Sequence, residues 1–462
     1  MNVVIIGGGL AGSEAACTLA RHGCAVDLYE MKPTKLSPAH RRETLGELVC
    51  SNSLGAEEWD TAPGLLKYEM SRLGSVVLNA ADRSRIPAGR ALGVDRDRFS
   101  DEVTATVSSL PGIRVIRQEV TTIPEADLVI VASGPLTSDA LSVDLAARVG
   151  SQLLYFYDSL SPIVTADSID YGKTYFASRY EPGKEDYLNC PMDRVTYEKF
   201  VGEIRNAEKV PIRAFEAMRC FEACLPIEVL AERGEATLAF GPMKPVGLED
   251  PRTGKRPHAV VQLRRENHPT TLYNLVGFQT RMKWGEQQRI FRMIPGLENA
   301  EFARMGSMHR NTYLESPRLL GPDLALKSDR RIILTGQIVG VEGYVESSAM
   351  GIWAGLVGVA RLQGLDLPPL PPPETAIGAL LRAVTTIPLH GIFSPMNVNF
   401  GLFPPVTDTK GGKEARRRRI VERAHVAEAS WRERLETDLG RAAPIRTGSE
   451  ALVTRAYGNV QP

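Results

Sequence analysis

The start of the chain constrains the fold more than any other stretch. Residues 3–6 are apolar and mostly β-branched, which is typical of a buried parallel strand. Glycines 7, 9 and 12 follow in the pattern G-x-G-x-x-G, and a predicted helix covers residues 13–22. A turn of this kind lets a pyrophosphate approach the backbone closely. It also places the pyrophosphate at a helix N-terminus, where the N–H dipoles favour negative charge.

A glycine fingerprint alone is a weak signal, because ordinary strand-to-helix turns also contain glycine. Here a second predicted strand, residues 25–29, leads directly to Glu30, where the ribose hydroxyls of an adenosine would bind. The sequence therefore predicts a bound dinucleotide. The residues predicted to contact it at this end are Gly7, Gly8, Gly9, Leu10, Ala11, Gly12 and Glu30.

Two later apolar strands, residues 127–131 and 331–335, also end in small residues. Flavoproteins of the two-dinucleotide-binding type have such strands where the chain leaves and re-enters the nucleotide domain, which favours FAD over NAD. The second of these glycine turns adds Gly336 and Gln337 to the predicted cofactor contacts.

The segment between these two strands predicts the domain organisation. From about residue 155 the alternation of strands and helices becomes irregular, so we expect a mixed α+β domain at 156–299 that binds substrate or RNA. The predicted fold class is α/β, with a Rossmann-like FAD-binding domain split between 1–155 and 300–462. The second of these parts includes a proline-rich connector at 365–374 and a basic C-terminal segment.

The charge balance and the hydropathy of the chain limit which nucleic-acid and membrane partners it can have. The chain has 55 basic and 55 acidic residues, so a nucleic acid must be bound by local basic patches. The stretches 252–265 and 410–423 are candidates, although such runs are also typical of solvated surfaces. There is no apolar run long enough to span a membrane and no signal-peptide pattern, so we expect a cytoplasmic protein without a membrane partner.

The cysteines suggest thiol chemistry rather than metal binding. None of the six forms a C-x-x-C pair, so we expect neither a zinc site nor a disulfide framework. Cys50 precedes Ser51, Asn52 and Ser53, a donor-rich loop that fits a cofactor contact as well as it fits a half-buried structural thiol. Cys224 lies just before Pro226, which indicates a helix end or break.

Several motifs along the chain together resemble one family. They are Gly-Gly-Gly-Leu-Ala-Gly-Ser-Glu-Ala-Ala (7–16), Val-Cys-Ser-Asn-Ser-Leu (49–54), Phe-Glu-Ala-Cys-Leu-Pro-Ile-Glu (221–228), Phe-Gly-Pro-Met-Lys-Pro-Val-Gly-Leu (240–248), Met-His-Arg-Asn-Thr-Tyr (308–313), Gly-Gln-Ile-x-Gly-Val-Glu-Gly-Tyr-x-Glu-Ser (336–347) and Asn-Phe-Gly-Leu-Phe-Pro-Pro (399–405). Through these motifs the chain is similar along essentially its whole length to the folate- and FAD-dependent tRNA (uracil-5-)-methyltransferases, the TrmFO family within the GidA/MnmG-like flavoproteins. Ala223 departs from the pattern, where glycine is expected.

The resemblance implies a reaction and assigns residues to it. A T-loop uridine of tRNA, at position 54, would be methylated at carbon 5 with 5,10-methylenetetrahydrofolate as carbon donor. Reduced FAD would supply the hydride, and NADH or NADPH would recharge it. By position Cys224 resembles the nucleophile and Cys50 a second functional cysteine near the flavin, with the division of labour between them open. Cys220 would be structural, and Tyr344 or His309 would stack on the pterin.

Three other hypotheses remain open at this stage. The same chemistry could act on a ribosomal-RNA uridine, or the chain could modify the wobble uridine of tRNA. A flavoprotein that binds or senses redox state through its cysteines belongs to a different class. It would still transfer the one-carbon unit after Cys224→Ala, whereas the methyltransferase would keep its flavin and lose activity.

Overall fold

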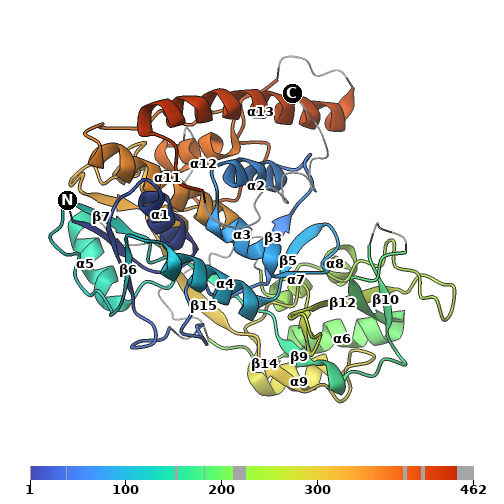
Figure 1. Cartoon of the computed structure of the whole chain (residues 1–462). Coiled ribbons are helices and arrows are strands. Elements are labelled where there is room, and N and C mark those ends of the chain that lie inside the picture. Colours follow the sequence, from blue (N-terminus) through green and yellow to red (C-terminus); the bar gives the residue numbers. More distant parts are fainter. Residues whose placement is uncertain are drawn as a thin grey trace.

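The computed structural model describes residues 2–37, 39–150, 154–179, 181, 183–211, 225–388, 393–406 and 411–444, with the backbone alone at 154–159, 309 and 310. This part of the chain forms two portions, each with its own sheet and hydrophobic core (Figure 1).

The first portion is built on a parallel sheet, which has five strands within the described residues. Their order is β16 (Ile332–Leu334), β7 (Leu128–Val131), β1 (Val3–Ile6), β2 (Val26–Glu30) and β6 (Ile113–Arg117). Every pairing is parallel, and all residues of β1, β7 and β16 are buried. Uninterrupted apolar strands are typical of parallel sheets covered on both faces. The predicted Rossmann-like α/β class is confirmed.

Helices from opposite ends of the chain meet in this portion. α1 (Leu10–Arg21) packs along α11 (Tyr344–Leu362). A Cβ added at Gly351 would lie 2.3 Å from the carbonyl oxygen of Ala11, and one added at Gly355 would lie 2.7 Å from Cβ of Thr18. The helices therefore approach closely because α11 has glycine at the contact, and this contact joins the two sequence segments of the first portion.

Between β2 and β7 the sequence predicts two amphipathic helices, one over residues 61–80 and one over residues 95–108. The structure differs in part from this expectation. A single helix over 61–80 is wrong, because the chain forms α2 (Ala62–Arg72) and α3 (Val76–Arg83), separated at Gly74 with φ +76°. The side chain of Ser75 starts α3 by accepting the N–H of Leu78 at 3.1 Å. The helix predicted at 95–108 is confirmed as α4 (Arg96–Ser109). The remaining elements here are α5 (Asp139–Val149) and a small antiparallel sheet of β3 (Ser53–Ala56), β5 (Ala91–Val94) and β4 (Arg85–Ile86).

The second portion has an antiparallel sheet covered by helices. Residues of α6 (Arg194–Asn206) and α9 (Trp284–Phe291) share its core with the sheet, through side chains such as Phe200, Phe291 and Leu263. The short helices α7 (Ile227–Glu232) and α8 (Thr237–Phe240) complete it. The strand order is β10 (Tyr175–Ala177), β11 (Tyr187–Met192), β12 (Ala259–Arg265), β13 (Leu272–Leu275), β9 (Ile163–Thr165) and β14 (Phe302–Arg304).

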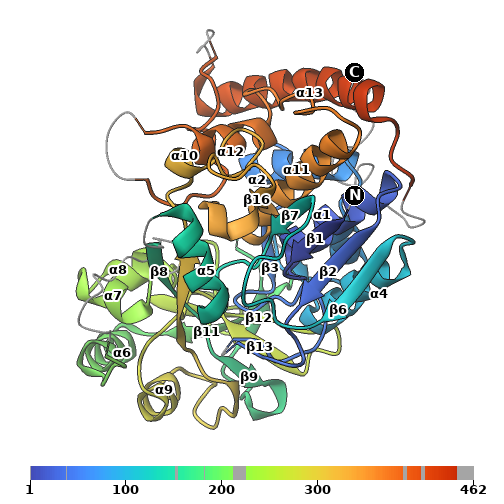
Figure 2. The same cartoon turned by 90° about the vertical axis from the view of Figure 1, so that its left-hand side faces the viewer.

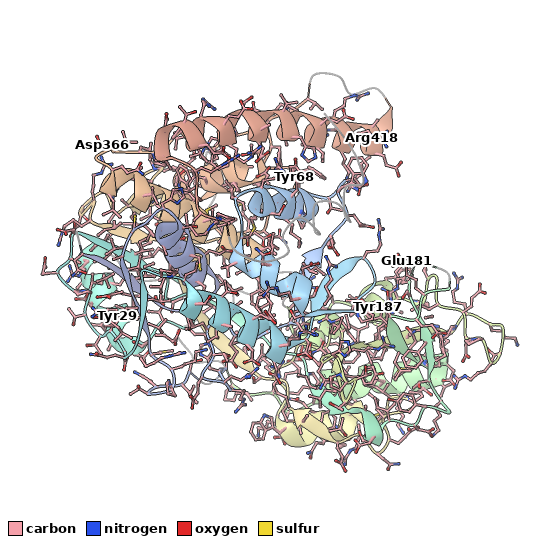
Figure 3. The ribbon with its side chains drawn as sticks, viewed as in Figure 1. Tyr29, Tyr68, Glu181, Tyr187, Asp366 and Arg418 are labelled. Carbon is pink, nitrogen blue, oxygen red and sulfur yellow. The ribbon has the colours of Figure 1, made fainter. Side chains whose placement is uncertain are left out.

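Two strands connect the portions. β8 (Leu154–Ser159) pairs antiparallel with β15 (Met308–Tyr313), and both lie between the two portions (Figure 2). A side-chain contact also joins the two portions, because the hydroxyl of Tyr187 in the second portion donates to the carbonyl of Ala88 in the first at 2.8 Å (Tyr187 is labelled in Figure 3). The division of the chain at 155 and 300 stays a prediction, which the two separate cores support.

The C-terminal part covers the first portion. α12 (Ala376–Thr385) and the long α13 (Gly412–Leu439) lie on the side of α2 and α11 (Figure 1). The indole of Trp431 in α13 donates to the carbonyl of Pro369 at 2.7 Å, so the proline-rich segment is fixed against this helix. None of the described helices is both long and apolar enough to cross a membrane. The remaining short elements are the 3-10 helices η1 (Ala166–Ser168) and η3 (Gly336–Val339) and the helix α10 (Ser316–Leu319).

Candidate active site

A cleft lies at the carboxyl edge of the parallel sheet, where open α/β sheets bind ligands. Its volume is about 1030 Å³ with the open solvent at its mouth included. The strand ends and the turns after them supply most of its wall. The predicted contacts that line it are Gly7, Gly9, Leu10, Ala11, Glu30, Gly336, Gln337 and Tyr344.

The glycine turn leaves space at one position and is tightly packed at two others. Gly7 has φ +106°, and a Cβ there would lie 2.6 Å from the carbonyl oxygen of Ala132. A Cβ at Gly12 would lie 1.9 Å from the carbonyl oxygen of Gly7. A Cβ at Gly9, in contrast, meets nothing within 4 Å. No side chain caps α1, so the N–H groups of its first turn can bind a ligand phosphate.

Glu30 lines the cleft at the end of β2. Only 6% of it is exposed. Its two carboxylate oxygens accept the backbone N–H groups of Gly8 at 2.9 Å and Lys32 at 3.0 Å. Each oxygen keeps a further lone pair, so the fixed carboxylate can accept bonds from two ribose hydroxyls.

The far end of the cleft is formed by the segment that begins α11. Gly336 has φ +80°, and the side chains of Tyr344 and Ser347 line the cleft. α11 begins at Tyr344, which lines the cleft, so a second helix N-terminus adjoins it. Two helix N-termini and one fixed carboxylate match the phosphates and ribose of a dinucleotide, so FAD fits this donor set.

The cleft also contains a charged pair that the sequence analysis did not identify. The ammonium of Lys32 lies 3.3 Å from the carboxylate of Glu47, and both side chains are nearly fully buried. Both residues line the cleft. Neither belongs to a recognisable motif, so only their contact in the fold reveals them.

The loop that carries Cys50 adjoins the cleft. The backbone N–H of Cys50 donates to the hydroxyl of Tyr344 at 2.7 Å, and the preceding Val49 lines the cleft itself. Asn52 is fully buried and binds the carbonyls of Val94 and Arg265 at 3.1 and 2.9 Å. The side-chain bonds of Ser51 and Asn52 therefore fix the loop. Contact of Ser51, Asn52 and Ser53 with a cofactor stays a prediction.

Arginines from three elements donate to this loop. Arg304 of β14 donates to the carbonyls of Val49 and Cys50 at 3.4 and 3.2 Å. Arg96 of α4 donates to the carbonyl of Cys50 at 3.2 Å. Arg264 of β12 donates to the hydroxyl of Ser51 at 2.8 Å and to Oδ1 of Asn52 at 2.7 Å.

Arg264 belongs to the basic stretch 252–265, which we had considered for phosphate contacts or a solvated surface. The residue is only 7% exposed, so the surface interpretation is wrong for it. Burial lowers the pKa of Arg264. Elsewhere in the stretch, Arg252 pairs with Asp250 at 2.7 Å.

Other predicted site residues lie outside the described part. Cys220 and Cys224 fall in residues 212–224, and the side chain of His309 is not described. The segment after Cys224 is fixed in the second portion. Ile227 begins α7, and the carboxylate of the buried Glu228 accepts bonds from Thr280 and from the N–H of Arg281, both at 2.9 Å.

The basic C-terminal stretch is described from residue 411 onward, and residues 412–423 of it form the start of α13. Arg417 stacks on Phe400 with its guanidinium carbon 5.8 Å from the ring centroid, and Arg418 lies 5.4 Å from the ring centroid of Trp59. Arg418 remains exposed near the N-terminal end of α13, across from Glu181 of the second portion (Figure 3).

Comparisons with known proteins find relatives along nearly the whole chain. The model of the family described as "Glucose inhibited division protein A" matches residues 2–366. The "Methylenetetrahydrofolate--tRNA-(uracil-5-)-methyltransferase TrmFO" of Desulforamulus reducens is 56% identical over 432 residues, covering 94% of this chain and 98% of the relative. The protein of the same name from Pelobacter propionicus is 54% identical, with 98% of this chain and 99% of the relative covered.

The solved structure of GidA from Aquifex aeolicus has the same fold. It superposes with a TM-score of 0.67 over 98% of this chain and 75% of that one, at 19% sequence identity. Identity this low supports the fold alone, whereas the near full-length relatives define the branch. The chain therefore belongs to the glucose inhibited division protein A family of flavoproteins and, within it, to the TrmFO group.

Proposed function

We propose that this protein methylates carbon 5 of a uridine in tRNA, with 5,10-methylenetetrahydrofolate as one-carbon donor and NADH or NADPH as reductant. The observation that carries the proposal is the 54–56% identity to relatives named for this reaction, along nearly the whole length of both chains. The target is the T-loop uridine at position 54, and the site of action is the cytoplasm.

The cleft residues would bind FAD, which supplies the hydride of this reaction when it is bound and reduced. Glu30 would accept the ribose hydroxyls, and the N–H groups at the start of α1 would bind the pyrophosphate. Gly336, Gln337 and the N-terminus of α11 would contact the flavin end. Tyr344 would then lie between the flavin end and the Cys50 loop, since its hydroxyl accepts the N–H of Cys50.

Thiol chemistry explains why the reaction needs cysteine. Carbon 5 of uracil is too weak a nucleophile to attack the carbon donor. Addition of the Cys224 thiolate to carbon 6 makes carbon 5 an enolate carbon, which can attack the methylene carbon of the folate. Carbon 5 then loses its proton to a base, for which we propose Cys50, as tetrahydrofolate leaves. The resulting exocyclic methylene accepts a hydride, and cleavage of the carbon 6–sulfur bond restores the ring and the thiolate.

A series of contacts supports the proposal that the thiols of Cys224 and Cys50 lie close together. Glu228, four residues after Cys224, binds Thr280. A Cβ added at Gly306 would lie 2.5 Å from the methyl carbon of Thr280, so these segments touch. Gly306 follows Arg304, which donates to the carbonyl of Cys50. The segment that leaves Cys224 therefore packs beside the strand that reaches the Cys50 loop.

Exposed arginines provide a surface for the RNA backbone. Arg416 and Arg418 at the start of α13 are exposed, as are Lys255 and Arg256 in the second portion. These cations would bind phosphates while the target base leaves its stack to reach the thiols.

The test is the product formed from an unmodified tRNA transcript. With methylenetetrahydrofolate and NADPH, nucleoside mass spectrometry should detect 5-methyluridine at position 54, and none in a transcript with cytidine there. The Cys224→Ala variant should purify with flavin but form no product. The proposal is wrong if the wild-type protein modifies only ribosomal RNA or the wobble uridine, or if Cys224→Ala still transfers the carbon unit.

A further inference from the structure

We propose that three guanidinium groups hold the thiol of Cys50 as a thiolate, and that the second portion activates this thiol by contributing two of the three. The catalytic consequence rests on the proposed function, whereas the ionisation of Cys50 can be measured without it.

The three arginines converge on one short loop. Arg96 and Arg304 both donate to the carbonyl oxygen of Cys50 at 3.2 Å. Arg264 binds the next two side chains, Ser51 and Asn52. Arg96 and Arg304 therefore contact the backbone at Cys50, and Arg264 contacts the side chains of the two residues that follow, so positive charge lies on both sides of Cys50.

The nearby acids only partly balance this charge. Glu266, which is 3% exposed, lies 3.0 Å from Arg96. Within the described residues, no carboxylate lies within ion-pair distance of Arg264 or Arg304, and Nε of Arg304 is buried without a hydrogen-bond partner. Burial, with a smaller contribution from Arg96, lowers the pKa of Arg304 to about 10.

The other titratable groups packed around the loop are already engaged. The carboxylate of Glu47 faces Lys32 at 3.3 Å. The carboxylate of Asp95, at the start of α4, accepts backbone N–H groups of Asp97, Arg98 and His268. Tyr344 accepts the N–H of Cys50 through its hydroxyl. The local excess of charge is positive, and a positive surrounding lowers the pKa of a thiol.

The charged residues around the Cys50 loop come from both portions of the molecule. Cys50 and Arg96 belong to the first portion, whereas Arg264 in β12, Arg304 in β14 and Glu266 belong to the second. When the second portion contacts the first, as at Tyr187 and Ala88, it brings two cations and one anion to the loop. The thiol therefore ionises readily only in the assembled molecule, with its proton released to water.

The experiment measures how fast iodoacetamide alkylates Cys50 in the flavin-loaded full chain, from pH 5.5 to 9.5, with the Cys50 peptide quantified by mass spectrometry. Because the thiolate is the reactive form, the midpoint of the rate profile reports the ionisation of Cys50. We expect a wild-type midpoint at least about one pH unit below the ordinary thiol value of about 8.5.

Four variants distinguish an effect of charge on the ionisation of Cys50 from an effect of lost structure. Arg304→Gln should raise the midpoint by about one pH unit, and Arg304→Lys should leave it near the wild-type value. Glu266→Gln, which removes the nearest negative charge, should lower it. Arg331→Gln, a change to a surface arginine that pairs with Asp329 at 2.8 Å, is the control and should leave it unchanged.

Loss of packing alone would not move the midpoint in opposite directions for Arg304→Gln and Glu266→Gln. A wild-type midpoint at or above about 8.5 overturns the proposal even if no variant folds. Equal midpoints for the wild type and Arg304→Gln also overturn it. Since the assay contains neither tRNA nor folate, its failure leaves the proposed methylation standing, and loss of methylation would not move the midpoint.

Discussion

At the scale of single residues, the glycine turn contains two kinds of glycine, those that the fold itself requires and one that it does not. Gly7 and Gly12 are needed by the protein itself, because a Cβ at either would overlap backbone atoms. Gly9 is not, since its backbone is extended with φ −74° and its Cβ would meet nothing within 4 Å. We therefore propose that the absence of a side chain at Gly9 serves the ligand rather than the fold.

Gly9→Ala should therefore separate cofactor binding from stability. We expect the flavin content of the purified protein to fall at least tenfold, because the added methyl occupies space beside the predicted pyrophosphate site. The melting temperature of the flavin-free protein should change little. Gly7→Ala is the matched comparison and should lower both. Full flavin content in the Gly9→Ala protein would contradict this placement of the pyrophosphate.

The same scale shows what the sequence could predict about the site. Glu30 and the glycines follow a strand in a fixed local pattern, so their place at the cleft could be expected from residues close together in the chain. Arg96, Arg264 and Arg304 could not be expected at the Cys50 loop, because they come from elements far apart in the sequence. Arg264 instead belonged to a run of cations typical of a surface.

At the scale of elements, the contact between α1 and α11 joins the two ends of the cleft. α1 begins at the glycine turn, and α11 begins at Tyr344 beside the Cys50 loop. Most predicted strands and helices are confirmed near their expected positions because their apolar patterns are strong. The single helix at 61–80 was wrong since its periodicity continues through Gly74, where the positive φ ends one helix before the next begins.

Gly351→Ala should disturb the cleft by forcing apart α1 and α11, the two helices that begin at it. The new methyl would lie 2.3 Å from the carbonyl oxygen of Ala11, so α11 must move away from α1. We expect a destabilisation of about 1–3 kcal/mol, as for overpacked cores, with a loss of flavin. Chemical denaturation and the flavin absorbance of the purified protein measure the two effects.

A second glycine in a helix provides the control. A Cβ at Gly202 in α6 meets nothing within 4 Å, so Gly202→Ala should stabilise the protein by about 0.5–1 kcal/mol through helix propensity. If both substitutions stabilise the protein, the close contact between α1 and α11 does not exist as described.

At the scale of the whole molecule, the second portion completes a site whose cofactor end belongs to the first. Its strands bring Arg264 and Arg304 to the Cys50 loop, and the segment after Cys224 packs beside them. The strands that flank residues 156–299 predict that this segment is inserted into the first portion. The sequence could not indicate how the two portions face each other, because the contacts between them join residues that share no local pattern.

The measurement that tests the account most directly is covalent trapping with a tRNA that carries 5-fluorouridine at position 54. Fluorine at carbon 5 cannot leave as a proton does, so the reaction should stop with enzyme, base and carbon unit joined. We predict that, with methylenetetrahydrofolate present, peptide mass spectrometry finds the nucleotide attached to Cys224, with Cys50 unattached. A nucleotide attached to Cys50 and not to Cys224, or no adduct at all, would contradict the claim that the Cys224 thiolate adds to the pyrimidine.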